Sequence, residues 1–152
     1  MRVKTTVVLL ILSSGVFAQG EAGFGPREAE QRMREYLRIW EGNENALTGG
    51  VNTYYAERVT YYGKNMTRSQ VLADKLRYDR AFPQRSYDIA PGSLRTKCEK
   101  GVCQARAELR WIRTDTSGRR ENGASDLRLA FSAGGDGRIV RESARTLRTQ
   151  RR

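Results

Sequence analysis

Residues 98–103 read Cys-Glu-Lys-Gly-Val-Cys, so two cysteines enclose a four-residue segment that contains a glycine. Glycine suits a tight turn, because it adopts positive φ without a steric penalty. In an oxidising compartment such a pair is expected to join as a disulfide across a β-hairpin. The spacing differs from that of a redox Cys-X-X-Cys motif, and we therefore predict that Cys98 and Cys103 form a structural cross-strand bridge.

The predicted bridge sets the register of the neighbouring strands. With the two cysteines opposite each other, antiparallel pairing places Thr96 opposite Ala105 and Leu94 opposite Ala107. The next hairpin, paired through its own turn, again brings apolar residues beside these alanines. The two hairpins therefore agree on one buried face, which gathers Leu94, Thr96, Ala105, Ala107, Leu109, Trp111, Leu127 and Leu129.

The opposite face of the same strands is polar and mostly basic. Arg95 is expected opposite Arg106, and like charges in direct cross-strand contact repel each other. A second copy of this face would be repelled as well, so we expect a monomer or a dimer formed through another edge. We define the basic face by its five predicted cations, which are Arg95, Lys97, Arg106, Arg110 and Arg128.

The chain downstream of Arg85 alternates with period two, which predicts an antiparallel meander of five strands. Turns containing glycine separate the later strands. The strands are expected at 86–90, 93–98, 103–114, 123–132 and 138–147, and the turns at 99–102, 115–120 and 134–137.

The upstream part predicts three helices and one short strand. Apolar residues at helical spacing indicate a first helix over 29–40 and a second from Asn45 that carries Tyr54 and Tyr55 on its stripe. A brief strand is expected at 57–62, ended by Gly63-Lys64-Asn65. Thr67-Arg68-Ser69-Gln70 matches a capping box, so a third helix starts there and stops at Phe82-Pro83. Its core-facing residues are expected to be Val71, Leu72 and Leu76.

The N-terminus has the pattern of a secretory signal. Arg2 and Lys4 precede a short apolar run, and Val16-Phe17-Ala18 suits a signal peptidase. We expect cleavage after Ala18 and a periplasmic or secreted protein; an uncleaved N-terminal anchor is the alternative. The expected organisation is a signal peptide (1–18), a flexible lead (19–26), one α+β domain (27–148) and a basic tail (149–152).

Positive charge dominates the chain, with a formal net charge of +11 that falls to +9 when the signal is removed. In an envelope compartment this excess favours an anionic surface or polymer over nucleic acid, and we expect no nucleic-acid partner. Membrane contact is expected only through the transient signal peptide. The charge also suits a simple role in keeping a small secreted domain soluble, and the sequence leaves both interpretations open.

Several catalytic classes are excluded by composition. The chain has no histidine, which removes Ser-His-Asp and Cys-His catalysis and the usual imidazole base. With both cysteines expected to be oxidised, only carboxylates are left as metal ligands, and we predict no metal and no cofactor. The glycine clusters at 23–25 and 134–137 have no strand-loop-helix setting and no phosphate-loop lysine.

The order helix, helix, short strand, helix and terminal strands resembles the nuclear transport factor 2-like (cystatin-like cone) fold. The resemblance covers 27–147 and is carried by Tyr54-Tyr55-Ala56 running into Val59-Thr60-Tyr61-Tyr62-Gly63, by the Thr67-capped helix and by the long last strands. It implies an α+β fold, with three N-terminal helices packed on a curved antiparallel sheet. Similar folds serve ketosteroid isomerase, polyketide cyclases, dehydratases and non-catalytic modules, so the fold does not specify a function.

The resemblance also implies a pocket inside the cone, which could take a small apolar molecule. We favour a non-catalytic binding or structural module of unknown ligand that recognises an anionic partner through the basic face. The alternative is an isomerase or cyclase-like enzyme that uses Asp and Tyr side chains in the cone. An open cavity with a buried acid at its base would favour the enzyme. The residues expected in the pocket are Tyr36, Trp40, Tyr54, Tyr55, Tyr62, Asp74 and Trp111.

Overall fold

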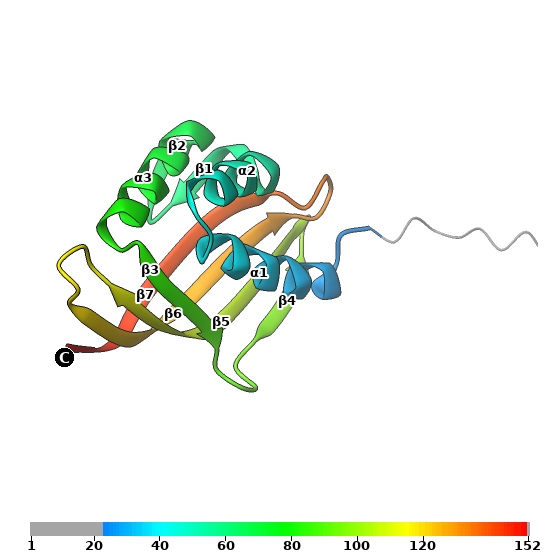
Figure 1. Cartoon of the computed structure of the whole chain (residues 1–152). Coiled ribbons are helices and arrows are strands. Elements are labelled where there is room, and N and C mark those ends of the chain that lie inside the picture. Colours follow the sequence, from blue (N-terminus) through cyan, green and yellow to red (C-terminus); the bar gives the residue numbers. More distant parts are fainter. Residues whose placement is uncertain (1–22, 152) are drawn as a thin grey trace, which may run out of the picture.

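Three helices lie on one face of a seven-stranded sheet, which confirms the predicted α+β architecture (Figure 1). The computed structural model describes residues 23–151, so the predicted signal peptide and its cleavage site lie outside the described residues. None of the described helices is long and apolar enough to cross a membrane. In chain order the elements are α1 (Pro26–Trp40), α2 (Glu44–Tyr54), β1 (Tyr55–Tyr61), β2 (Lys64–Thr67), α3 (Arg68–Ala81), β3 (Gln84–Ile89), β4 (Arg95–Glu99), β5 (Val102–Thr114), β6 (Arg120–Ser132) and β7 (Ile139–Arg151).

The helix boundaries follow from local sequence. Pro26 opens α1 with its φ already suited to a helix, and the Glu28 carboxylate accepts a hydrogen bond from the Gly25 amide at 3.0 Å. The predicted capping box of α3 is confirmed: Thr67 Oγ1 accepts from the Gln70 amide at 3.2 Å, and Gln70 Oε1 accepts from the Thr67 amide at 2.8 Å. Phe82 caps α3 directly before Pro83.

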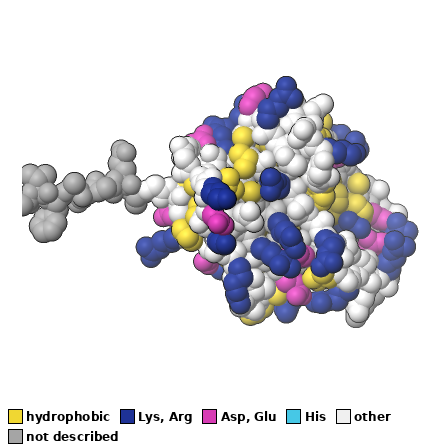
Figure 2. Space-filling view, turned by 180° about the vertical axis from the view of Figure 1, so that it is seen from behind, with side chains coloured by type: hydrophobic (Ala, Val, Ile, Leu, Met, Phe, Trp, Pro, Cys, Tyr) yellow, Lys and Arg dark blue, Asp and Glu magenta, His cyan; other side chains and the backbone are white. Residues whose placement is uncertain are grey.

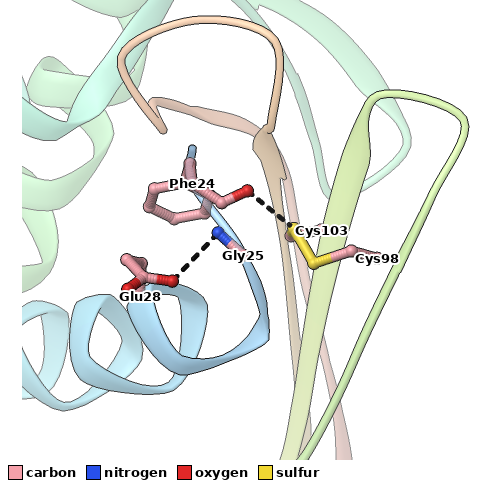
Figure 3. Close-up of a disulfide and its surroundings, with 5 residues drawn as sticks. All are labelled: Phe24, Gly25, Glu28, Cys98 and Cys103. Atoms are coloured by element: carbon pink, nitrogen blue, oxygen red, sulfur yellow. Dashed lines mark hydrogen bonds between the residues drawn. A yellow bond between two sulfur atoms is a disulfide. The ribbon is translucent and has the colours of Figure 1, made fainter. Parts of the chain in front are cut away.

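The disulfide and its register are as predicted. Cys98 and Cys103 are bonded, and Lys100 and Gly101 both adopt positive φ in a two-residue hairpin turn (Figure 3). One expected pair is absent, because Leu94 precedes β4 and does not pair with Ala107. The pairs that agree with the predicted register are Thr96 with Ala105, Arg95 with Arg106, Ala107 with Leu127 and Ala105 with Leu129.

The predicted meander is wrong at the edge formed by its first two strands. β3 and β4 do not pair with each other; both pair with β5, β3 along its second half and β4 along its first. Pro91-Gly92 interrupts the chain between them, and a proline in that position removes a donor from any continuous ladder. At the other edge β1 runs parallel to β7, which gives the order β2-β1-β7-β6-β5-β3.

Three element boundaries also differ from the expectations. Tyr55 ends the helical segment and begins β1, so its side chain belongs to the sheet. Gly63-Lys64-Asn65 was expected to end a strand, but Lys64–Thr67 form β2 after a turn in which Tyr62 and Gly63 have positive φ. β7 continues to Arg151, which pairs with Glu121, so residues 149–151 of the expected tail extend the sheet.

The described part of the expected flexible lead is packed against the sheet. The Phe24 ring lies 5.5 Å from the Phe131 ring, and its carbonyl oxygen lies 3.6 Å from Cys103 Sγ (Figure 3). A side chain at Gly137 would collide with the Phe24 ring, so this glycine allows the close approach. The start of α1 is therefore held next to the disulfide hairpin.

The two faces of the sheet differ in the way the register requires. The inner face and the helices enclose the apolar core, whereas basic side chains gather on the outer face (Figure 2). All five predicted members of the basic face are exposed. The core includes Ala29, Met33, Leu37, Val51, Val59, Val71, Ala105, Ala107, Leu127, Leu129, Phe131 and Ile139.

Candidate functional site

A cavity of about 550 Å³ opens between the helices and the inner face of the sheet. Seven of the nineteen residues in its wall are aromatic, and they come from α1, β1, α3, β3 and β5 and from the turn after β1. Such concave, largely apolar spaces with a few polar groups are the usual form of small-molecule sites. The aromatic members of the wall are Tyr36, Trp40, Tyr61, Tyr62, Tyr78, Tyr87 and Trp111.

Trp40 is central to this aromatic wall. Its ring centroid lies 6.1 Å from that of Tyr36, 5.8 Å from that of Tyr78 and 6.4 Å from that of Tyr87. The first two contacts are edge-to-face, the arrangement that the ring quadrupoles favour. The rings therefore support one another, so the wall is largely formed before any ligand arrives.

Arg113 contacts several side chains of the cavity wall near the β5–β6 hairpin. Its guanidinium carbon lies 4.1 Å from the Phe82 ring centroid and 4.9 Å from the Trp111 ring centroid. The same group pairs with Glu121 at 2.8 Å and donates to the Tyr78 hydroxyl at 3.1 Å. With a carboxylate, a phenol and two ring faces engaged, this arginine positions aromatic side chains.

One carboxylate reaches the cavity. Asp74, on α3, accepts a hydrogen bond from the Tyr61 hydroxyl at 3.0 Å and is ion-paired with Arg77 one turn later. Burial raises the pKa of Tyr61 well above its ordinary value, with the charges of Glu142 and Asp74 adding to the effect. Tyr61 therefore remains a protonated donor at neutral pH and orients the Asp74 carboxylate at the cavity wall.

A second carboxylate, Glu142 of β7, is fully buried beside the cavity. It accepts hydrogen bonds from the Tyr36 hydroxyl at 2.7 Å and from the Tyr55 hydroxyl, and it pairs with Lys75 Nζ at 3.1 Å. The ammonium also lies 3.5 Å from the centre of the Trp40 ring. We call Glu142, Lys75, Tyr36 and Tyr55 the buried polar cluster.

Burial controls the ionisation of this cluster. Desolvation lowers the pKa of Lys75 to about 8, against the attraction of Glu142, which acts in the opposite direction. Burial and the Glu142 charge raise the pKa of both Tyr36 and Tyr55 well above the ordinary value. The two phenols therefore stay protonated and keep donating to Glu142.

The two carboxylates differ in what they could do chemically. Glu142 is saturated by three donors, and it is not among the residues that line the cavity, so it has no path to a ligand. Asp74 lines the cavity and is one-third exposed. Among the acids at this end of the cone, Asp74 is the one placed to accept a proton from a bound molecule.

Five of the seven residues expected in the pocket lie on the cavity wall: Tyr36, Trp40, Tyr62, Asp74 and Trp111. The other two lie elsewhere. Tyr55 is buried with its hydroxyl on Glu142, and Tyr54 stacks against Arg32, whose guanidinium carbon is 4.6 Å from its ring centroid. Both tyrosines were expected in the pocket because one continuous helix would carry Tyr54 and Tyr55 on the same stripe. The helix α2 instead ends between them.

Sequence reasoning missed Lys75 and Glu142. Lys75 lies one helical turn after Val71, and these two are the fully buried residues of α3, while the expected Leu72 and Leu76 are only half-buried. Glu142 occupies an inward position of β7 beyond a register shift opposite Ala130 and Phe131, so simple alternation loses it. The sequence did contain a signal for the burial of Lys75, because this lysine has the helical spacing of the apolar residues of α3.

Comparison with known proteins identifies the fold. No family model matches the chain, and no curated protein matches it by sequence. A nuclear transport factor 2-like superfamily protein from Salmonella enterica serovar Typhimurium superposes with a TM-score of 0.67 at 9% identity, covering 80% of this chain and 89% of that one. A hexachlorocyclohexane dehydrochlorinase (LinA type 2) gives 0.65 at 10% identity, covering 83% and 88%.

A candidate scytalone dehydratase from Novosphingobium aromaticivorans also matches, with a TM-score of 0.65 at 16% identity over 82% of this chain and 85% of that one. These likenesses show that the chain has the nuclear transport factor 2-like cone fold, as its segment order predicts. Several of the similar structures carry the names of enzymes. At these identities the activities belong to those proteins.

Proposed function

We propose that the protein binds a small, partly aromatic molecule inside its cone. The observation that carries this proposal is the open cavity of about 550 Å³ with seven aromatic rings in its wall. Asp74 and Ser125 supply polar groups at the wall, which would orient a ligand that carries a hydroxyl or amine. The disulfide is compatible with an exported protein, and we place the function outside the cytoplasm on that basis and on the signal-like N-terminus.

Binding is favoured over catalysis by the state of the buried acid. An open cavity with a buried acid at its base is the arrangement expected to favour an enzyme, and the cavity is open with Glu142 buried beside it. The buried acid, however, is Glu142, whose two oxygens are occupied by Tyr36, Tyr55 and Lys75. A carboxylate held in this way supports the wall of a site.

A cavity-filling variant tests the binding function. The neutral fluorescent probe N-phenyl-1-naphthylamine should bind at one saturable site, because it is aromatic and avoids the positive outer face. Ala144→Phe places a ring inside the cavity, where Ala144 pairs with Leu127, and should weaken probe binding at least about tenfold. Ala73→Phe, on the exposed side of α3, is the matched control and should bind like the parent. Equal binding by Ala144→Phe and the parent would refute the proposal.

A second candidate function is proton transfer in the cone, as in an isomerase or cyclase. The observation that favours it is Asp74, which lines the cavity with its carboxylate oriented by the Tyr61 hydroxyl. A base held in an apolar cavity beside aromatic walls suits removal of a proton from a carbon acid. The fold of the dehydratase and dehydrochlorinase named above is compatible with this chemistry.

The probe for this second function is 5-nitrobenzisoxazole. A base removes its ring C–H proton, the released electron pair forms the nitrile, and the N–O bond breaks to leave a coloured phenolate. Asp74→Asn should abolish any rate above that of acetate buffer, while probe binding is retained. Glu57→Gln, which changes an exposed carboxylate paired with Arg68, is the control. A parent protein with no rate above buffer, or an unchanged rate in Asp74→Asn, would exclude Asp74 as a base.

A further inference from the structure

The outer face of the sheet contains a buried acid that organises two exposed arginines. Asp126 of β6 keeps only 7% of its side chain exposed, while the Arg106 and Arg128 side chains are 58% and 55% exposed. Its Oδ1 accepts from Arg106 Nε at 2.6 Å. Its Oδ2 accepts from Arg128 Nε at 3.2 Å and from an Arg128 terminal nitrogen at 2.9 Å. One carboxylate thus fixes the orientation of two guanidinium groups.

These bonds leave donors directed to solvent. Asp126 occupies only Nε of Arg106, so both terminal nitrogens of Arg106 have no acceptor within residues 23–151. The Nη1 group of Arg128 likewise has none in the described part of the chain. A guanidinium is a planar fork that matches carboxylate, sulfate and phosphate groups, and one that is already oriented loses less freedom on binding.

Further arginines surround this pair. Arg106 lies directly between Arg95 and Arg128 in the cross-strand register. Arg128 is opposite Ser143, and on β7 that serine is flanked by Arg141 and Arg145. Like charges placed opposite one another destabilise a sheet, so the arrangement has a cost that folding alone does not explain. Figure 2 shows the resulting concentration of basic side chains on the side away from the helices.

Few acids on the described outer face offset this charge. Asp126 is shared by two arginines, and Glu99 and Glu108 are paired with Lys97 and Arg148. The exposed Asp88 lies opposite Arg110 at the β3 edge. No ion pair within residues 23–151 engages Arg95, Arg141 or Arg145. The face therefore keeps an excess of positive charge around a preorganised arginine pair.

The geometry points to an acidic polysaccharide as the partner of this face, bound through its carboxylate or sulfate groups. Neighbouring strands are about 4.8 Å apart, so the row from Arg95 through Arg106 to Arg128 spans roughly 10 Å and suits successive anionic groups on a chain. Gln104 and Ser143 lie among the arginines in the register, and their polar side chains would be available to sugar hydroxyls. The row has no aromatic ring on which a nucleic-acid base would stack and no apolar side chain that would enter a bilayer.

The inference can be tested by a substitution that adds positive charge to the face and removes the contacts that orient the two arginines. The probe is fluorescein-labelled polygalacturonate, with neutral dextran as the control polymer. Asp126→Asn adds one positive unit to the face and also releases the two guanidinium groups. If only net charge mattered, binding would tighten. With oriented forks, binding should weaken about fivefold or more, although the face has become more positive.

Two further variants keep the test decisive. Glu99→Gln adds the same charge at the hairpin end and leaves the Asp126 contacts intact, so its affinity should equal or exceed that of the parent. Arg128→Lys keeps the charge and loses the fork at an exposed position, and it should weaken binding about fivefold even if Asp126→Asn folds poorly.

Three results would overturn the inference: unchanged or tighter binding by both Asp126→Asn and Arg128→Lys, equal binding to dextran, or tighter binding to acidic vesicles or single-stranded DNA than to polygalacturonate. Ala144→Phe should bind the polymer like the parent, because the cone cavity lies on the other face of the sheet. The polymer surface and the cone site therefore succeed or fail independently.

Discussion

Two buried carboxylates lie on adjacent strands of this sheet and serve opposite faces. Glu142 of β7 is directed into the cone, and its partners Lys75, Tyr36 and Tyr55 are themselves buried. Asp126 of β6 is also buried, but its partners Arg106 and Arg128 extend into solvent. Both acids are buried, so the two sites differ in whether the side chains that donate to the acid are buried or extend into solvent.

The difference separates a structural acid from one that shapes a surface. A carboxylate whose donors are all buried is closed to ligands, and its value is in holding α1, α3, β1 and β7 together. A carboxylate that binds only part of each guanidinium leaves oriented donors for a partner. Glu142 should therefore contribute more to stability than Asp126, because solvent screens the ion pairs of Asp126 and does not reach the ion pair of Glu142.

The largest expected effect is at the inner acid. Glu142→Gln removes the charge opposite a lysine that has no access to water, and breaking a buried pair from one side costs about 3–5 kcal/mol. Urea unfolding followed by circular dichroism should show this loss at pH 7. The double variant Lys75→Met with Glu142→Gln should lose less than the two single variants together, because it leaves no unpaired buried charge.

A loss below about 1 kcal/mol in Glu142→Gln would contradict this account of the cluster. It would mean that Lys75 is neutral at pH 7 or that water reaches it. In that case the contrast between the two acids would disappear.

The second effect is a dependence of stability on pH. The pKa of Lys75 is about 8 in the folded protein, below its ordinary 10.5, because burial disfavours the ammonium. Between these values the unfolded chain holds a proton that the folded chain has released, so the free energy of unfolding should rise with pH, by up to about 3 kcal/mol. Above pH 10 it should fall again, because Tyr36 and Tyr55 stay protonated only when folded.

The measurement is urea unfolding at intervals from pH 7 to 11. Lys75→Met should abolish the rise between pH 8 and 10 and retain the fall above it. A rise of equal size in Lys75→Met would assign the titration to another group.

Much of the fold was accessible from the sequence, because its signals are local. The CEKGVC segment gave the hairpin register, and with it the separation of an apolar face from a basic one, and both are present. The Thr67 capping box gave the start of α3 within a residue. The parallel contact between β1 and β7 was not accessible, since it joins segments about 80 residues apart and depends on how the whole sheet closes.

The candidate site was harder to predict for the same reason. Aromatic residues such as Tyr36 and Trp111 could be assigned to a cone interior from the fold alone. The pairing of Lys75 with Glu142 joins α3 to the last strand beyond a register shift. The spacing of α3 could indicate that Lys75 is buried, but it could not indicate its partner. The orientation of Arg106 and Arg128 by Asp126 is likewise a property of side-chain geometry. The sequence indicated only that Arg106 and Arg128 share a face.

The smallest expected effect on stability is at the outer acid. Asp126→Asn should cost under about 1 kcal/mol in urea unfolding, because Arg106 and Arg128 are more than half exposed and water replaces the lost contacts. The same variant is expected to lose polymer affinity. Asp126→Asn should therefore lose mainly binding, whereas Glu142→Gln should lose mainly stability. If Asp126→Asn instead destabilised the protein as strongly as Glu142→Gln, the outer acid would be a structural element like the inner one, and the arginine pair would lose its claim to a binding role.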